Sequence, residues 1–374
     1  MQVPKITYFN PHILEKLASM KPNKAVIARQ KYKNFNMWLE GKNYPTYNQL
    51  VELSKLFNVP FGYFFLDKLP EYLFPIPHYR TNQNGVFTPS EELKDTLEYA
   101  EDIQKWAKDI LIELGNDKLS FCGKLKNEYK VDEVVDELKN IFEIRDGWAE
   151  SMNSWRDAFR YLVTKAEEKG IIVLVNGVVW NNTHRKLDVE EFRGFVLYDE
   201  IAPVIFINNN DYISGKIFTL IHEVVHIIIG KSASFDLKDL QSAQNEIEKF
   251  CDKCTAEFLV PSQELKKAYK GIKNYEELAK KFKVSQIVIA RRLLDLELIS
   301  KNEFYNFLQD SKRKEIKQYN RGGNFYEMEI QRLSRRFLRI LSSAIDNNLI
   351  TYLDAIRFTK LKRDTFSKLV RYST

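Results

Sequence analysis

Cysteine is scarce in this sequence. Only three of its 374 residues are cysteines, Cys122, Cys251 and Cys254. An odd and sparse set in a chain of this length excludes a framework of disulfide bonds and predicts reduced thiols. Histidine is also rare, with five residues, so a pair of histidines at a meaningful spacing stands out.

Long hydrophobic runs are missing as well. No uninterrupted apolar stretch reaches the roughly 18 to 20 residues of a membrane span, and the first residues lack the apolar core and cleavage site of a signal peptide. We therefore expect a cytoplasmic protein with no membrane partner. The length and the 44% of hydrophobic residues are enough for two or three packed domains.

The charges are divided unevenly along the chain. Lys and Arg outnumber Asp and Glu by 10 to 4 in residues 1–68 and by 25 to 13 in residues 262–374, whereas residues 69–261 hold 22 against 34. This partition suggests modules with different partners. Basic ends that only keep the protein soluble, or that bind its own acidic middle, remain an equal alternative.

Residues 1–68 have the pattern of a small helical module. Helices are predicted over 11–20, 24–39 and 46–57, and three short helices with a basic surplus fit a helix-turn-helix domain. The segment also resembles the Xre family of repressor domains in Trp38, Gly41, Pro45, Thr46, Gln49, Leu50 and residues 57–66. The resemblance implies DNA binding, with a module used for protein contacts as the competing interpretation.

Residues 69–150 are predicted to be a linker followed by a helical scaffold. The linker is rich in proline and asparagine. Thr88 and Glu91 then form a capping-box pattern, and Gly115 is a plausible stop, so a helix is predicted over 89–114.

Residues 151–261 change to a mixed pattern. A helix is predicted near 154–169, and three segments rich in Val, Ile and aromatic residues are predicted strands, at 171–175, 192–198 and 202–208. The fold class predicted from the whole chain is α+β, a mostly helical multi-domain protein with a small β-sheet packed against its helices.

Residues 262–374 are predicted to form a basic helical domain, in which 279–296 resembles a second helix-turn-helix. A helix over about 326–347 would carry four arginines on one face, at i, i+3, i+4 and i+7: Arg332, Arg335, Arg336 and Arg339. Such a face suits the phosphates of a nucleic acid or an acidic protein partner. A simple solvated face is at least as plausible.

The chemistry of the chain is concentrated in His222-Glu223-Val224-Val225-His226, an HExxH motif within an apolar segment. On a helix the two histidines lie about 6 Å apart on one face and can bind one zinc ion, with Glu223 near a bound water. On a strand they would be about 13 Å apart. Although β-branched residues surround the motif, we predict a buried helix that ends at Gly230, with the small sheet packed on it.

Zinc needs a third protein ligand, and spacing alone leaves six downstream carboxylates open: Asp236, Asp239, Glu246, Glu248, Asp252 and Glu257. The stretches 218–226 and 248–261 resemble the two motifs of ImmA/IrrE-type metallopeptidases. The resemblance implies a zincin-like core at 151–261, with Glu248 as third ligand and Asp252 orienting a ligand histidine. Cys251 and Cys254 replace apolar residues of that motif, and we predict that they pack in the core.

The resemblance also implies a mechanism of the gluzincin type. Zinc held by His222, His226 and Glu248 would polarise a water, and Glu223 would remove its proton for attack on a peptide bond. The first hypothesis is thus a zinc endopeptidase that cleaves a regulatory protein such as a repressor, brought to DNA or to its target by the N-terminal module. The second is a transcription regulator or antitoxin that binds DNA or a toxin and whose metal site is structural or idle.

Overall fold

The computed structural model describes residues 5–20, 22–57, 59, 61–68, 89–126, 130–230, 241–269, 274–312, 325–359 and 361–373. The chain divides into two compact units, Met1–Phe74 and Pro75–Thr374. Within the described ranges, none of the helices has both the length and the apolar composition needed to cross a membrane.

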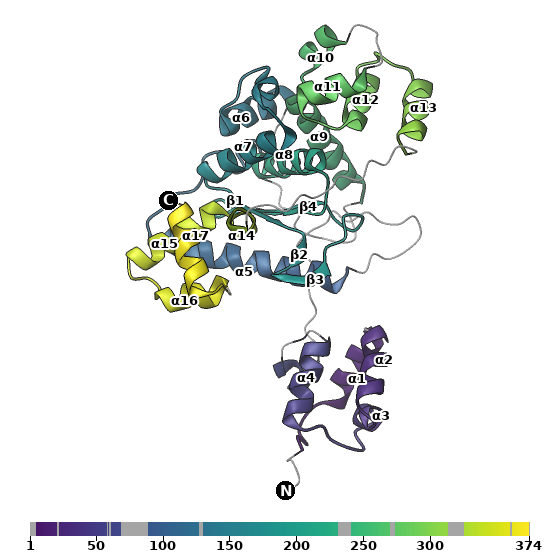
Figure 1. Ribbon diagram of the computed structural model, residues 1–374, viewed down its shortest axis with the longest axis vertical. Helices are drawn as coiled ribbons and strands as arrows, with labels where there is room; N and C mark the ends of the chain where they lie inside the picture. The colour runs from purple at the N-terminus through teal and green to yellow at the C-terminus, as the bar shows by residue number, and fades with distance from the viewer. Residues whose placement is uncertain are drawn as a thin grey trace. The chain divides into compact units, whose positions relative to one another are not determined.

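The first unit consists of short helices (Figure 1), and its hydrophobic core includes several aromatic side chains. Its elements are α1 (Pro11–Met20), α2 (Pro22–Lys31), α3 (Phe35–Leu39), α4 (Tyr47–Phe57) and the 3-10 helix η1 (Phe61–Phe65). The ring of Phe35 lies 6.3 Å from those of Trp38 and Phe57, measured between centroids, and all three are buried. A capping box begins α4, because Thr46 N donates to Gln49 Oε1 and Gln49 N donates to Thr46 Oγ1.

The prediction of one helix over 24–39 is wrong, since the chain turns between Lys31 and Phe35. The turn lets α3 pack against both α1 and α2, and the rings of Phe35 and Trp38 thereby reach the core.

The second unit contains a small sheet among many helices. The helices that precede the sheet are α5 (Glu91–Glu113), α6 (Val131–Phe142), the 3-10 helix η2 (Trp148–Ser151) and α7 (Trp155–Glu168). The strands are β1 (Ile172–Asn176), β2 (Val178–Val179), β3 (Asn182–Lys186), β4 (Gly194–Leu197) and β5 (Val204–Asn208). The helices that follow are α8 (Ile213–Ile229), α9 (Gln241–Leu259), α10 (Ser262–Ala268), α11 (Tyr275–Phe282), α12 (Gln286–Asp295), α13 (Lys301–Lys312), α14 (Phe325–Leu333), α15 (Arg335–Asp346), α16 (Tyr352–Thr359) and α17 (Arg363–Ser373). The predicted α+β class is confirmed.

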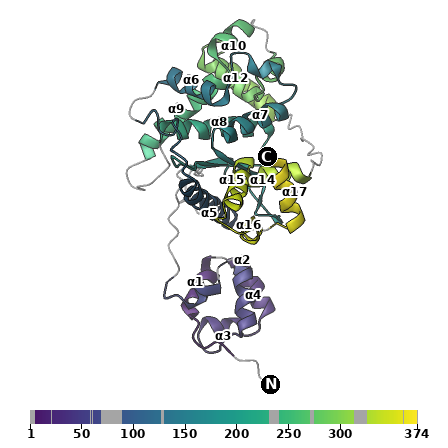
Figure 2. The same ribbon diagram turned by 90° about the vertical axis from the view of Figure 1, so that its left-hand side faces the viewer.

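Helices cover both faces of the central sheet (Figures 1 and 2). The strand order is β1-β5-β4, with β5 parallel to β1 and antiparallel to β4, while β2 and β3 form a separate pair. The helices α7 and α8 lie on one face, and α5, α14 and α15 lie on the other. Because neither face meets water, every residue of β1 and β5 is buried, which explains their continuous apolar sequences.

The predicted boundaries at 150 and 261 lie inside this unit, and residues on both sides of each boundary share one hydrophobic core. From the predicted scaffold, α6 packs against α8 and α9. From the predicted C-terminal domain, Arg292 of α12 donates to the carbonyl of Val260 (3.2 Å) and forms an ion pair with Glu257 of α9. These contacts join the acidic segment 69–261 to the basic segment that follows it, although their charge patterns suggested separate modules.

The N-terminal cap of α5 differs from the prediction. Its capping residue is Ser90, whose Oγ accepts from Leu93 N (3.1 Å), whereas Thr88 lies outside the described residues. Glu191, which precedes β4, fixes this cap by accepting from the N–H and the hydroxyl of Ser90 at 2.7 and 2.6 Å. A residue distant in sequence therefore takes part in this cap. The predicted stop is close, since Gly115 has a φ of +73°.

The single helix predicted over 326–347 is also wrong. The helices α14 and α15 meet at the buried Ser334, whose φ of +68° is left-handed. The Ser334 hydroxyl donates to Glu167 Oε1 of α7 (2.5 Å) and accepts from Val173 N of β1 (3.3 Å). Glu167 also accepts from Arg335 N (2.8 Å), at the start of α15. This buried network ties the C-terminal helices to the core and interrupts the helix.

The break separates the predicted arginine face. Arg332 lies in the last turn of α14, while Arg335, Arg336 and Arg339 lie on α15. Arg332 and Arg335 form ion pairs with glutamates of α14 at 2.6 and 3.3 Å, and Arg336 is half-buried. Contact with a nucleic acid or partner stays a prediction for these residues individually, because the continuous face is not formed.

Burial of Glu167 predicts a dependence of stability on pH. Desolvation, only partly offset by the hydrogen bonds from Ser334 and the α15 backbone, raises the pKa of Glu167 to about 7 from 4.5. The folded state therefore favours the protonated acid, and stability is lost as the pH rises from 4.5 to about 7, with a total of about 3 kcal/mol. In Glu167→Gln the amide does not titrate, so this contribution should vanish.

Urea unfolding of wild type and Glu167→Gln at several values between pH 5 and pH 8 measures the difference. We expect the wild type to lose stability relative to the variant as the pH rises. Parallel curves over that range would show that Glu167 ionises in the folded protein as it does in the unfolded chain.

Candidate metal centre

The HExxH motif lies on α8, and the predicted helix is confirmed. Buried apolar residues surround the motif, among them Leu220, Val224 and Ile227, so tertiary packing overrides the β-propensity of the valines and isoleucines. The helix ends at Gly230, whose φ of +64° provides a left-handed cap. Its last carbonyls are satisfied from outside, since Ile227 O accepts from Gly123 N at 2.8 Å.

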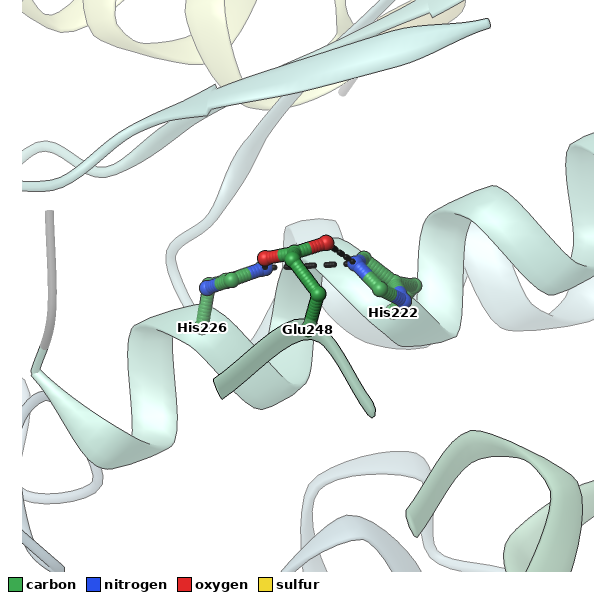
Figure 3. A group of neighbouring side chains, drawn as sticks. All are labelled: His222, His226 and Glu248. Carbon is green, nitrogen blue, oxygen red and sulfur yellow. Dashed lines mark hydrogen bonds and ion pairs between the residues drawn. The ribbon is translucent and has the colours of Figure 1, made fainter. Parts of the chain in front are cut away.

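The two histidines of α8 meet a glutamate of α9 (Figure 3). Glu248 Oε2 lies 3.0 Å from His222 Nε2, and Glu248 Oε1 lies 3.0 Å from His226 Nε2. The two Nε2 atoms are 3.2 Å apart. The helical spacing of four residues thus brings both rings to one point, and the packing of α9 against α8 brings the carboxylate to the same point.

The three side chains fit a metal ion by both chemistry and spacing. One ligand atom from each lies within 4.8 Å of the others. Nitrogen and oxygen ligands of a tetrahedral zinc ion lie roughly 3.3 to 3.5 Å apart, close to the separations seen here. Two imidazoles and one carboxylate leave the fourth position for water, which is the arrangement of a catalytic rather than a structural zinc site.

Charge is strongly coupled within this cluster. Burial opposes a charge on His222, but contacts with Asp252 and Glu248 outweigh it and raise the pKa of His222 to about 10. Burial also opposes the charge of Glu248, yet the two histidines hold the pKa of its carboxyl well below the usual range. Glu248 therefore remains a carboxylate, and the cluster attracts a positive charge.

Residues 166–294 match the model of the IrrE N-terminal-like domain, Peptidase_M78. The match covers less than half of the chain but includes the sheet, α8 and α9, and it supports the resemblance to ImmA/IrrE proteins and a peptidase role. A comparison with curated proteins finds no match.

The structure distinguishes among the carboxylates that spacing left open. Glu248 joins the histidines, as the ImmA/IrrE resemblance implies. Glu246 is exposed and Glu257 forms an ion pair with Arg292, whereas Asp236 and Asp239 lie outside the described residues. Asp252 Oδ1 lies 3.1 Å from His222 Nδ1, the ring atom opposite the cluster. That is the place of a residue that orients a ligand histidine.

Glu223 follows His222 on α8 and is 8% exposed. Burial and the nearby charge of Glu248 raise the pKa of its carboxyl, while the two histidines lower it. Glu223 is not one of the three converging side chains. Glu223 is therefore a buried carboxyl outside the group of side chains that could hold an ion.

Cys251 has a contact that the sequence analysis missed. Its Sγ lies 3.8 Å from His226 Nδ1, and burial raises the pKa of its thiol, so the sulfur keeps its proton. Cys251 and Cys254 are both fully buried in the core, as predicted. The sequence held one signal for this contact, because Cys251 is next to Asp252, which was predicted to orient a histidine. That signal could not be used without knowing how α9 packs against α8.

Removal of one ligand tests the cluster directly. Purified protein should retain about one zinc ion per chain after dialysis, and His226→Ala should retain less than about a tenth of that amount, because a nitrogen and a carboxylate alone bind zinc weakly. Metal content by plasma mass spectrometry provides the measurement. His184→Ala, which changes an exposed histidine on β3, is the matched control and should keep its zinc. Equal zinc in His226→Ala and the wild type would place the metal elsewhere.

Proposed function

We propose that this chain is a zinc-dependent endopeptidase that cleaves a specific regulatory protein, such as a repressor. The observation that carries the proposal is the convergence of His222, His226 and Glu248 with Glu223 beside them on a buried helix. The match of residues 166–294 to the IrrE N-terminal-like domain supports the same reaction class.

Each residue of the centre has a task in this reaction. His222 and His226 would hold a zinc ion through Nε2, Glu248 would add an anionic ligand, and Asp252 would orient the His222 ring from Nδ1. A bound zinc ion supplies Lewis-acid chemistry, which acidifies a water molecule and polarises a peptide carbonyl. Glu223 accepts the proton of the attacking water and returns it to the leaving amine. Burial makes its carboxyl a stronger base than an exposed glutamate.

We also propose that the first unit delivers the peptidase to its target or to DNA. The unit is compact, consists of short helices and carries the basic surplus of residues 1–68. Arg29 and Lys33, near the turn between α2 and α3, are exposed. Phosphates or an acidic protein surface are suitable partners for such residues.

The alternative is a transcription regulator or antitoxin in which the metal site is structural. A helical unit separate from the site is compatible with operator or toxin binding. The two functions make different demands on Glu223, since only hydrolysis needs a base.

Substitution of Glu223 separates these functions. Glu223→Gln should keep about one zinc ion per chain, because no ligand is changed, but should lower cleavage at least about 100-fold, because the amide cannot accept a proton. New protein N-termini, compared by mass spectrometry between cells that express the wild type and cells that express the variant, should identify fragments made only by the wild type.

Identical N-termini from the two strains, together with full activity of Glu223→Gln in operator binding or toxin neutralisation, would support the regulator and exclude the peptidase. Zinc content serves as the control for an intact site.

A further inference from the structure

Two consecutive residues of α9 contact the two histidines. Asp252 Oδ1 lies 3.1 Å from His222 Nδ1, and Cys251 Sγ lies 3.8 Å from His226 Nδ1, a distance within the longer range of hydrogen bonds to sulfur. A histidine that binds a metal ion through Nε2 carries its proton on Nδ1, and the acceptor of that proton fixes the tautomer and the ring orientation. Both contacts are therefore made at the Nδ1 atom of a histidine, but one acceptor is a carboxylate oxygen and the other is a thiol sulfur.

The difference lies in both charge and solvent. Asp252 is a carboxylate whose side chain is 60% exposed, so water solvates its charge, although His222 Nδ1 itself is buried. Cys251 is 0% exposed and His226 is 3% exposed. The contact of His226 Nδ1 with sulfur is thus made in a dry environment, where a polar hydrogen without an acceptor is costly.

We propose that Cys251 is a positioning residue for the metal centre, in which its sulfur accepts the Nδ1–H of His226 and holds Nε2 toward Glu248 and His222. The inference rests on the zinc site proposed above. The ImmA/IrrE motif that residues 248–261 resemble has alanine at the position of Cys251, so the motif itself does not provide this contact.

Cys254 provides a matched control within the same helix. It is a fully buried cysteine three residues further along α9, and it forms no hydrogen bond with either histidine in the described part of the chain. A change of Cys254 to alanine removes a similar volume from the same core. An effect on zinc that appears at Cys251 and not at Cys254 is therefore due to the histidine contact.

The experiment compares zinc dissociation constants of the full chain by chelator competition in a thiol-free reductant. Wild type, Cys251→Ala, Cys251→Ser and Cys254→Ala are measured. Cys251→Ala should bind zinc about tenfold more weakly, the lower end of the range for outer partners because a thiol is a weak acceptor. Cys251→Ser should recover most of this loss since its hydroxyl also accepts, and Cys254→Ala should match the wild type.

A second measurement reports on the ring itself. With nitrogen-15 histidine, long-range proton–nitrogen NMR spectra of the zinc-loaded protein contain only five rings, and they report the tautomer of each. The Nδ1 signal of His226 should shift in Cys251→Ala and return toward the wild type in Cys251→Ser, while that of His222 stays in place. A role in packing alone would not produce this pattern.

Zinc affinity and His226 signals unchanged in Cys251→Ala would overturn the inference, as would an equal loss of affinity in Cys254→Ala. If the wild type itself fails to bind zinc, the proposed peptidase fails and the inference fails with it. The two failures are distinguishable because the wild type is measured first.

Discussion

The burial of α8 on all sides is the constraint on which the site depends. A helix without an exposed face has to satisfy its backbone within the protein, and the contact from Gly123 N to Ile227 O does so at the end where unpaired carbonyls would remain. Held in this way, a segment rich in β-branched residues stays helical. His222 and His226 then share one face, and the chemistry of the site follows from that geometry.

The elements next to α8 also have to pack closely against it. The edge strand β4 comes close at Gly194, where an added Cβ would lie 2.4 Å from Thr219 Cγ2, so only glycine permits this packing. On another side, α9 contributes three side chains from about one helical turn. Glu248 lies between the two Nε2 atoms, while Cys251 and Asp252 contact the Nδ1 atoms of the histidines. Because the whole centre comes from two packed helices, a small shift of either would separate its ligands.

Local features of the sequence predicted most of the fold but not its long-range exceptions. Periodicity and residue type located β1, β5 and α7, and the HExxH spacing identified two of the three converging side chains without any tertiary information. Glu248 needed a family resemblance, because the distance along the chain from α8 does not specify how α9 packs. The break at Ser334 and the cap at Ser90 were missed, and each involves a hydrogen bond to a glutamate far away in sequence, Glu167 and Glu191. The contact of Cys251 with His226 was missed as well, because it depends on how α9 packs against α8.

The charges of the centre give an independent reason to expect a cation there. Glu223 and Glu248 are two carboxylates close to each other in a poorly solvated site, and Asp252 adds a third at its edge. Their repulsion favours a positive charge nearby, and in spite of burial these carboxylates raise the pKa of His222 to about 10. A divalent ion would supply such a charge and displace a proton from His222. The carboxylates that make His222 basic would therefore also attract a metal ion, so protons and a metal ion would compete for this site.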